Sequence, residues 1–88
     1  MTREEEIRRG HEAARILAEP LLVEAFAALD ARYLAEWRAT PVRDAEGREL
    51  IWQMTRALHA MRDHLTTLVE TGMLATIQAE KEGNTNAR

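Results

Sequence analysis

The sequence contains no cysteine and no serine among its 88 residues, and it has few aromatic, proline or glycine residues. Without cysteine there is no disulfide framework, no zinc site built on thiolates and no cysteine nucleophile, and without serine there is no serine nucleophile. No apolar run approaches the roughly 20 residues that span a bilayer, and no apolar signal-peptide segment follows Met1. We therefore expect a cytoplasmic protein that does not bind membranes.

The charge balance gives no sign of a large basic surface. The chain has 12 Lys and Arg against 15 Asp and Glu, a net charge of −3 and a sequence pI of about 5.6. Proteins that bind DNA or RNA usually concentrate basic residues on one surface. The composition therefore does not favour nucleic acid as the partner.

Alanine, by contrast, is abundant within the 45% of residues that are hydrophobic. Alanine has the highest helix propensity, whereas the β-branched and aromatic residues that favour strands are scarce. The composition therefore predicts one small all-α domain. Folding a chain of this length buries only about 60–65% of its surface, so the core should be thin.

Local signals divide the first half of the chain into two helices. Thr2 is a suitable N-cap for a helix over 3–19, because three glutamates follow it in the first turn and interact favourably with the helix dipole. Pro20 breaks this helix and suits the first position of a second helix over 20–39. Pro41 should end the second helix.

The third helix has the strongest periodic signal in the sequence. Asp44 is its expected N-cap, and apolar residues then recur at alternating spacings of three and four residues, as in a coiled coil. We expect this helix over 45–81. The polar segment 83–88 contains a helix stop, so the folded domain should cover 1–82 and end in a flexible tail. The seam consists of Ile51, Met54, Leu58, Met61, Leu65, Leu68, Gly72 and Ala75.

The two arms match in length, since the helix over 45–81 spans about 55 Å and the two earlier helices together span a similar distance. A short connection brings them antiparallel, which predicts a long helical hairpin whose first arm is broken at Pro20. A hairpin leaves apolar stripes open, so we expect assembly into a helical bundle or binding of a partner protein. The expected interface residues are Phe26, Tyr33, Trp37, Ile51, Trp52, Met54, Leu58, Met61, Leu65, Leu68 and Gly72.

Gly72 lies inside the third helix at a seam position, where glycine costs roughly 1 kcal/mol relative to alanine. One interpretation is the close approach of another helix through Gly10 or Ala14. The alternative is that the third helix bends or ends at Gly72.

No residue pattern points to catalysis, a cofactor or a metal, so we do not expect an enzyme. His11 begins a partial zinc-protease pattern, but Arg15 occupies the position of the second histidine. His59 and Asp63 share a helix face and could share a proton or a metal. His64 points elsewhere on the same helix, so the simplest interpretation is that all three histidines are surface residues.

Three segments resemble small helical proteins that bacteriophage genomes encode, often with no assigned function. They are Arg9-Gly10-x-x-Ala13-x-x-Ile16-Leu17-x-x-Pro20-Leu21, the stretch from Trp37 to Trp52, and Glu70-Thr71-Gly72-x-Leu74-Ala75. The hairpin is also similar to the oligomerisation region of small terminase subunits, which build rings. The chain departs from those subunits because no helix-turn-helix domain precedes the hairpin.

The resemblance implies a phage morphogenesis or DNA-packaging accessory protein in the host cytoplasm. We expect a non-enzymatic, oligomeric assembly or interaction protein without a cofactor. Two alternatives are compatible with the sequence. One is a helical bundle that binds nucleic acid through Arg43, Arg48 and Arg56, and the other is a small phage inhibitor of a host enzyme.

Overall fold

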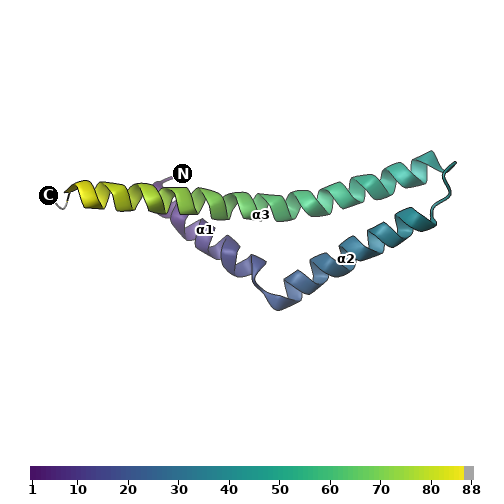
Figure 1. The fold of residues 1–88 in the computed structure, drawn as a ribbon, viewed down its shortest axis with the longest axis horizontal. Coiled ribbons are helices and arrows are strands. Elements are labelled where there is room, and N and C mark those ends of the chain that lie inside the picture. The colour runs from purple at the N-terminus through teal and green to yellow at the C-terminus, as the bar shows by residue number, and fades with distance from the viewer. Residues whose placement is uncertain (87–88) are drawn as a thin grey trace.

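The computed structural model describes residues 1–86, which form three helices and no strand (Figure 1). The helices are α1 (Arg3–Leu17), α2 (Pro20–Ala39) and α3 (Ala45–Asn86). Helices α1 and α2 form one arm with an elbow at Pro20, and α3 runs back along both of them (Figure 1). The predicted all-α hairpin with a broken first arm is confirmed.

The helix starts follow the local signals in the sequence. The hydroxyl oxygen of Thr2 accepts a hydrogen bond from the backbone N–H of Glu5 at 3.2 Å, and a carboxylate oxygen of Asp44 accepts one from the N–H of Gly47 at 3.0 Å. These bonds satisfy backbone donors that the first turn of a helix otherwise leaves unpaired. Both predicted N-caps are present.

The elbow forms because the residue before proline is disfavoured from helical geometry. Glu19 has the extended backbone angles φ −64° and ψ 119°, and α1 already ends at Leu17, two residues before the predicted end. The N–H of Ala18 still donates to the carbonyl oxygen of Ala14 at 3.1 Å. The chain therefore turns within two residues after the end of α1, and α2 runs in a different direction from α1.

The end of α3 differs from the prediction. The helix does not end near residue 81 but continues to Asn86, because Gly83 remains helical instead of taking the positive φ of a glycine C-cap. Residues 83–86 therefore belong to α3. Residues 87 and 88 of the predicted tail lie outside the described residues.

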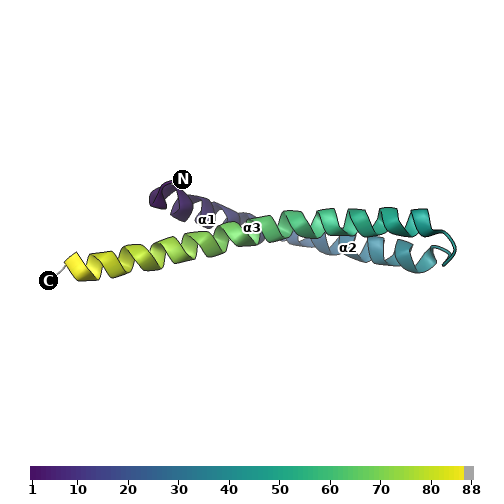
Figure 2. The ribbon, with the colours of Figure 1, turned by 90° about the horizontal axis from the view of Figure 1, so that it is seen from above.

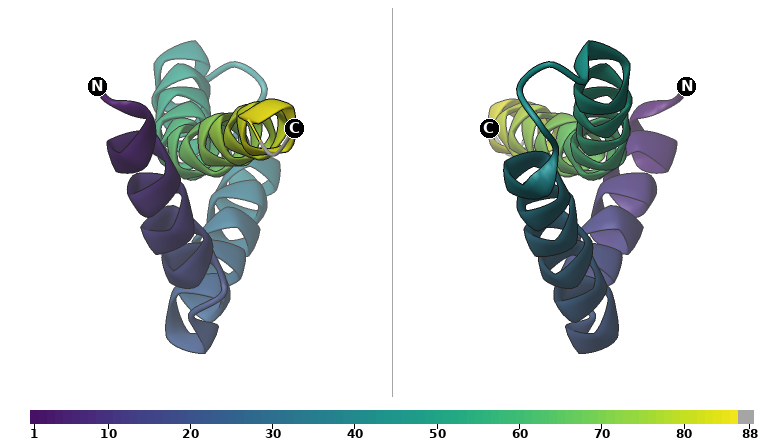
Figure 3. Two further views of the ribbon diagram at one scale, coloured as in Figure 1. Left: turned by 90° about the vertical axis from the view of Figure 1, so that its left-hand side faces the viewer. Right: turned by 90° about the vertical axis from the view of Figure 1, so that its right-hand side faces the viewer.

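The first arm crosses α3 along its length. Figure 2 shows α1 on one side of α3 and α2 on the other, and the end views in Figure 3 show α1 and α2 diverging from each other around α3. Different sides of α3 are consequently covered in its two halves. This crossing decides which of the apolar seam residues are enclosed.

Glycines bring α1 and α3 into backbone contact. A Cβ atom built on Gly10 would lie 2.9 Å from the Cα of Gly72 and 3.0 Å from the carbonyl oxygen of Leu68. Ala13 of α1 and Ala75 of α3 are buried beside this contact. The predicted close approach at Gly72 is present, with Gly10 as the partner.

The molecule is thin, and little of it is enclosed. Its extents are 68 × 25 × 17 Å and its radius of gyration is 19.1 Å, against about 12 Å for a compact domain of this length. Among the described residues the buried hydrophobic side chains are Ala13, Phe26 and Ala75. On α2, Phe26 is buried and Leu22 and Leu29 are half-buried.

Candidate interaction surface

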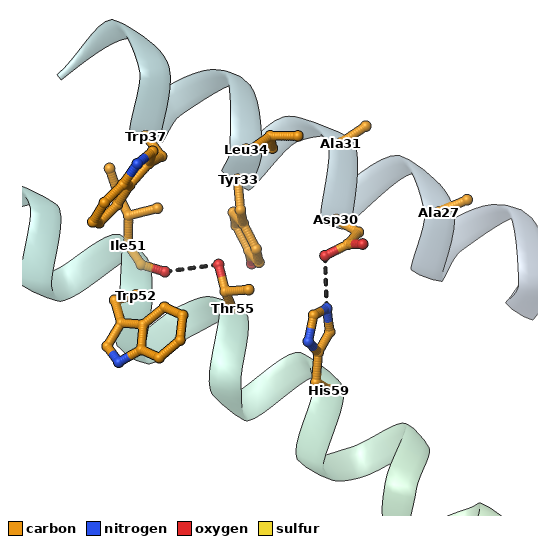
Figure 4. Close-up of a pocket in the computed structure, with 10 residues that line it drawn as sticks. All are labelled: Ala27, Asp30, Ala31, Tyr33, Leu34, Trp37, Ile51, Trp52, Thr55 and His59. Atoms are coloured by element: carbon orange, nitrogen blue, oxygen red, sulfur yellow. Dashed lines mark hydrogen bonds and ion pairs between the residues drawn. The ribbon is translucent and has the colours of Figure 1, made fainter.

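A groove lies between α2 and α3, near the closed end of the hairpin (Figure 4). Its volume is about 660 Å³. From α2 it is lined by Ala27, Asp30, Ala31, Tyr33, Leu34 and Trp37, and from α3 by Ile51, Trp52, Thr55 and His59. We call this surface the α2–α3 groove.

Aromatic rings line the end of the groove nearest the connection, and an arginine lies over each of the two indole rings. The guanidinium carbon of Arg48 lies 3.9 Å from the ring centroid of Trp37, and that of Arg56 lies 5.7 Å from the ring centroid of Trp52. Both distances are within the range of a cation–π interaction. The Trp52 side chain nevertheless remains about half exposed, so its ring is available to another molecule.

A polar contact crosses the groove at its other end. The Nε2 atom of His59 lies 2.7 Å from Oδ1 of Asp30, so the pair links α3 to α2 (Figure 4). The sequence offered Asp63, one turn away on the same helix, as a possible partner of His59, but the structure pairs His59 with Asp30. Asp30 is 29 residues from His59, and only the register of the hairpin brings them together.

The side chains of Asp30, His59 and Thr55 in the groove have hydrogen-bond partners within the hairpin. The hydroxyl of Thr55 donates to the carbonyl oxygen of Ile51 at 2.9 Å, within α3. Within residues 1–83 no buried side-chain nitrogen or oxygen lacks a hydrogen-bond partner. The surface that the groove presents is mainly apolar.

The predicted interface residues are divided between the interior of the hairpin and its surface. Phe26 is buried. Gly72 is also buried, because its backbone contacts that of Gly10. The exposed members are Trp52, Met54 and Met61. The half-buried members are Tyr33, Trp37, Ile51, Leu58, Leu65 and Leu68.

The crossing of the first arm explains this division. The seam residues of α3 form one continuous stripe in sequence, but α2 covers one side of α3 and α1 covers another (Figure 2). Met54 and Met61 are left exposed. Leu34, Ala27 and Ala31 of the groove were not among the predicted interface residues, although Leu34 stands out in the sequence as a large apolar residue off the main stripe.

A second hollow of about 410 Å³ lies between α1 and α3, beside the glycine contact. Met73 and Ile77 of α3 line it and are exposed, and His11 and Ala14 line it from α1. Apolar surface is therefore open at both ends of the hairpin.

The three arginines predicted as nucleic-acid contacts lie toward the closed end of the hairpin. Arg43 is in the connection, Arg48 lies over Trp37, and Arg56 lies beside Trp52. Arg43 lies outside α3, and Arg48 and Arg56 lie two turns apart on it, so the three do not form one continuous basic stripe. Neither of the two stacked guanidiniums takes part in an ion pair between described residues.

At the open end of the hairpin, Arg3 of α1 binds Glu82 of α3 through both carboxylate oxygens, with one of the contacts at 2.8 Å. The hydrogen bond and the positive charge of Arg3 lower the pKa of the Glu82 carboxyl, and the same contact raises the pKa of Arg3. This pair ties the start of α1 to the last turns of α3.

The described part of the chain contains no group of three or more His, Cys, Asp or Glu side chains placed to hold a metal ion. None of its helices combines the length and apolar character that crossing a membrane requires.

Comparison with known proteins adds no family, because no family model, no curated protein and no solved structure matches the chain. The geometry itself defines a three-helix hairpin with an exposed aromatic groove.

Proposed function

We propose that this chain is a non-enzymatic assembly module that associates with further copies of itself through its exposed apolar faces. The observation that carries the proposal is the exposed surface of 6940 Å² on a 10.0 kDa chain. A compact monomer of this mass exposes about 5,200 Å². The excess of about 1,700 Å² is similar to the surface that a stable protein–protein interface buries.

The chemistry of that surface supports the same conclusion. Large hydrophobic side chains are exposed on all three helices, and several are more than half exposed. Extensive exposed apolar surface on a thin helical protein usually marks an interaction site. The exposed side chains include Leu21, Val23, Leu34, Leu50, Trp52, Met61, Met73, Leu74 and Ile77.

Two packed hairpins would form a four-helix bundle at the groove end, an arrangement that encloses such stripes. The resemblance of the sequence to phage-encoded helical proteins extends this proposal to an accessory role in particle assembly or DNA packaging, in the host cytoplasm. In that role the chain would supply an interface and no chemistry.

Molar mass in solution tests the proposal. We expect light scattering coupled to gel filtration to give at least twice 10.0 kDa, and the mass should fall toward that of a monomer on dilution. A mass of one chain at the highest concentration that remains soluble would contradict the proposal.

The arginines at the closed end favour nucleic acid as a second candidate partner, because Arg48 and Arg56 each lie over an exposed or half-exposed indole ring. Arginine and aromatic side chains together can contact phosphates and stack on bases. Fluorescence anisotropy with labelled single- and double-stranded oligonucleotides at low salt would measure such binding. The triple variant with Arg43, Arg48 and Arg56 changed to Ala should then lose it, and an absence of binding by the unmodified chain would exclude this candidate.

A further inference from the structure

We infer that the α2–α3 groove receives the same groove of a second copy, with the two hairpins antiparallel, so that the closed end of one lies over the elbow end of the other. The inference rests on the proposed self-association and assigns it a surface and an orientation. The groove is suited to a helix pair because Ala27 and Ala31 let another backbone approach closely. Leu34 and Trp52 supply exposed apolar surface beside them.

Charged residues along the α2 edge of the groove change sign from one end to the other. Glu24 lies seven residues before Ala31 and Arg38 lies seven residues after it, and residues seven apart lie on nearly the same side of a helix. Both charged side chains are exposed. The α2 edge is therefore acidic toward the elbow and basic toward the closed end.

The α3 edge repeats this pattern. Arg56 and Asp63 are also seven residues apart, both are exposed, and they lie three residues before and four residues after His59. Since the His59–Asp30 contact places residue 59 level with residue 30, the two charge patterns are centred at the same level of the hairpin. None of the four charged groups forms an ion pair with another described residue.

This charge pattern distinguishes two ways to stack one groove on another. In the antiparallel arrangement the two-fold axis passes near Ala31 and His59, so Glu24 faces Arg38 of the second copy and Arg56 faces its Asp63. In the alternative, with both closed ends together, α2 lies over the second copy's α3. Arg38 then lies near the arginines of that helix, and Glu24 lies near its Asp63.

Among these four residues, unlike charges face each other in the antiparallel arrangement, and Glu24 and Asp63 come together in the alternative. Exposed charge pairs contribute little affinity but penalise the wrong orientation, so the apolar groove provides the affinity and the charges select the direction. The excess of exposed surface over a compact monomer, about 1,700 Å², is enough for one such interface.

Two matched substitutions test the surface. Leu34 in the groove is 48% exposed and Met61, outside the groove, is 53% exposed. We expect Leu34→Glu to weaken self-association by at least about 100-fold, and Met61→Glu to change it by less than about five-fold. Both variants should retain their helical circular dichroism, because neither side chain is buried.

Charge reversal tests the orientation. In the antiparallel arrangement Arg38→Glu should weaken association several-fold, since it places two glutamates opposite each other, and the double variant with Glu24→Arg should restore it. If the closed ends met instead, Arg38→Glu would strengthen association.

A cysteine introduced at Ala31 gives an independent test, because the chain has no cysteine of its own. Ala31 lies near its own copy across the proposed axis, so oxidised Ala31→Cys protein should run as a covalent dimer on a non-reducing gel, whereas Met61→Cys should not. A covalent dimer of Met61→Cys but not of Ala31→Cys would overturn the inference. So would dissociation by Met61→Glu and not by Leu34→Glu. Either result would leave the proposed self-association intact. A strictly monomeric unmodified chain would overturn both.

Discussion

Gly10 of α1 and Gly72 of α3 are in backbone contact, with no room for a side chain on either. A Cβ atom on Gly72 would lie 3.0 Å from both the carbonyl oxygen of Glu6 and the Cα of Gly10. These neighbours are backbone atoms, which cannot move aside as a flexible side chain can. The contact thus fixes the position of α1 on α3.

Gly72→Ala should destabilise the chain by roughly 1–3 kcal/mol, because the new methyl group separates the two helices. Gly83→Ala is the matched control, since nothing lies within 4 Å of its Cβ position. Gly83→Ala should raise the free energy of unfolding by about 0.5–1 kcal/mol, because alanine favours the helix more than glycine does. Urea denaturation followed by circular dichroism measures both effects, and stabilisation by Gly72→Ala would contradict the close contact.

The Asp30–His59 pair should couple the two arms weakly, because both side chains are more than a third exposed. A double-mutant cycle with Asp30→Ala and His59→Ala should give a coupling free energy of about 0.2–1 kcal/mol near pH 6. The same cycle with Asp63 in place of Asp30 should give no coupling. If Asp63 coupled to His59 and Asp30 did not, the register of α2 on α3 would be wrong.

Asp44→Ala should destabilise the chain by about 1 kcal/mol, because the first turn of α3 loses the acceptor for the N–H of Gly47. Asp44→Asn and Asp44→Ser should keep most of the stability, since both side chains can cap a helix. Thermal unfolding of the three variants checks this expectation. Equal losses in all three would mean that the negative charge, and not the hydrogen bond, is responsible.

The Arg3–Glu82 pair should make part of the stability depend on pH. Because Arg3 lowers the pKa of Glu82 in the folded chain, the contribution is present above the ordinary glutamate pKa of about 4.3 and is lost as the pH falls through the lower folded value. Thermal melts of the unmodified chain and of Glu82→Gln should differ slightly at pH 7 and coincide near pH 2.

Salt provides the control for this pair, since both groups are exposed to solvent and their attraction is screened at high ionic strength. The difference between the two melting temperatures at pH 7 should shrink in 1 M NaCl. A difference that persists at pH 2 and in high salt would show that the Glu82→Gln substitution acts through packing and not through charge.

Local signals in the sequence were sufficient to predict where each helix starts. Thr2, Pro20 and Asp44 act within one turn of the chain, so their effects on helix ends can be predicted without a tertiary structure. The pairing of small residues at Gly10 and Gly72 was predictable for a related reason, since glycine in a helix interior needs a compensating contact.

The arrangement of the arms around α3 could not be predicted in the same way. The elbow at Pro20 lets the first arm cross α3, and the sequence does not give the angle of that crossing (Figure 2). The exposure of Met54 and Met61 and the pairing of Asp30 with His59 both depend on it. The end of α3 was missed because Gly83 is compatible with both a helix and a stop.

The elbow at Pro20 gives the two halves of the first arm different tolerance to mutation. On the α1 side the glycine contact admits no larger side chain, so changes at Gly10 or Gly72 should be tolerated poorly. On the α2 side Ala27, Ala31 and Leu34 face open space and can change without harm to the hairpin itself. A mutational scan should therefore separate into two classes, with folding defects along α1 and association defects with normal folding along the groove face of α2.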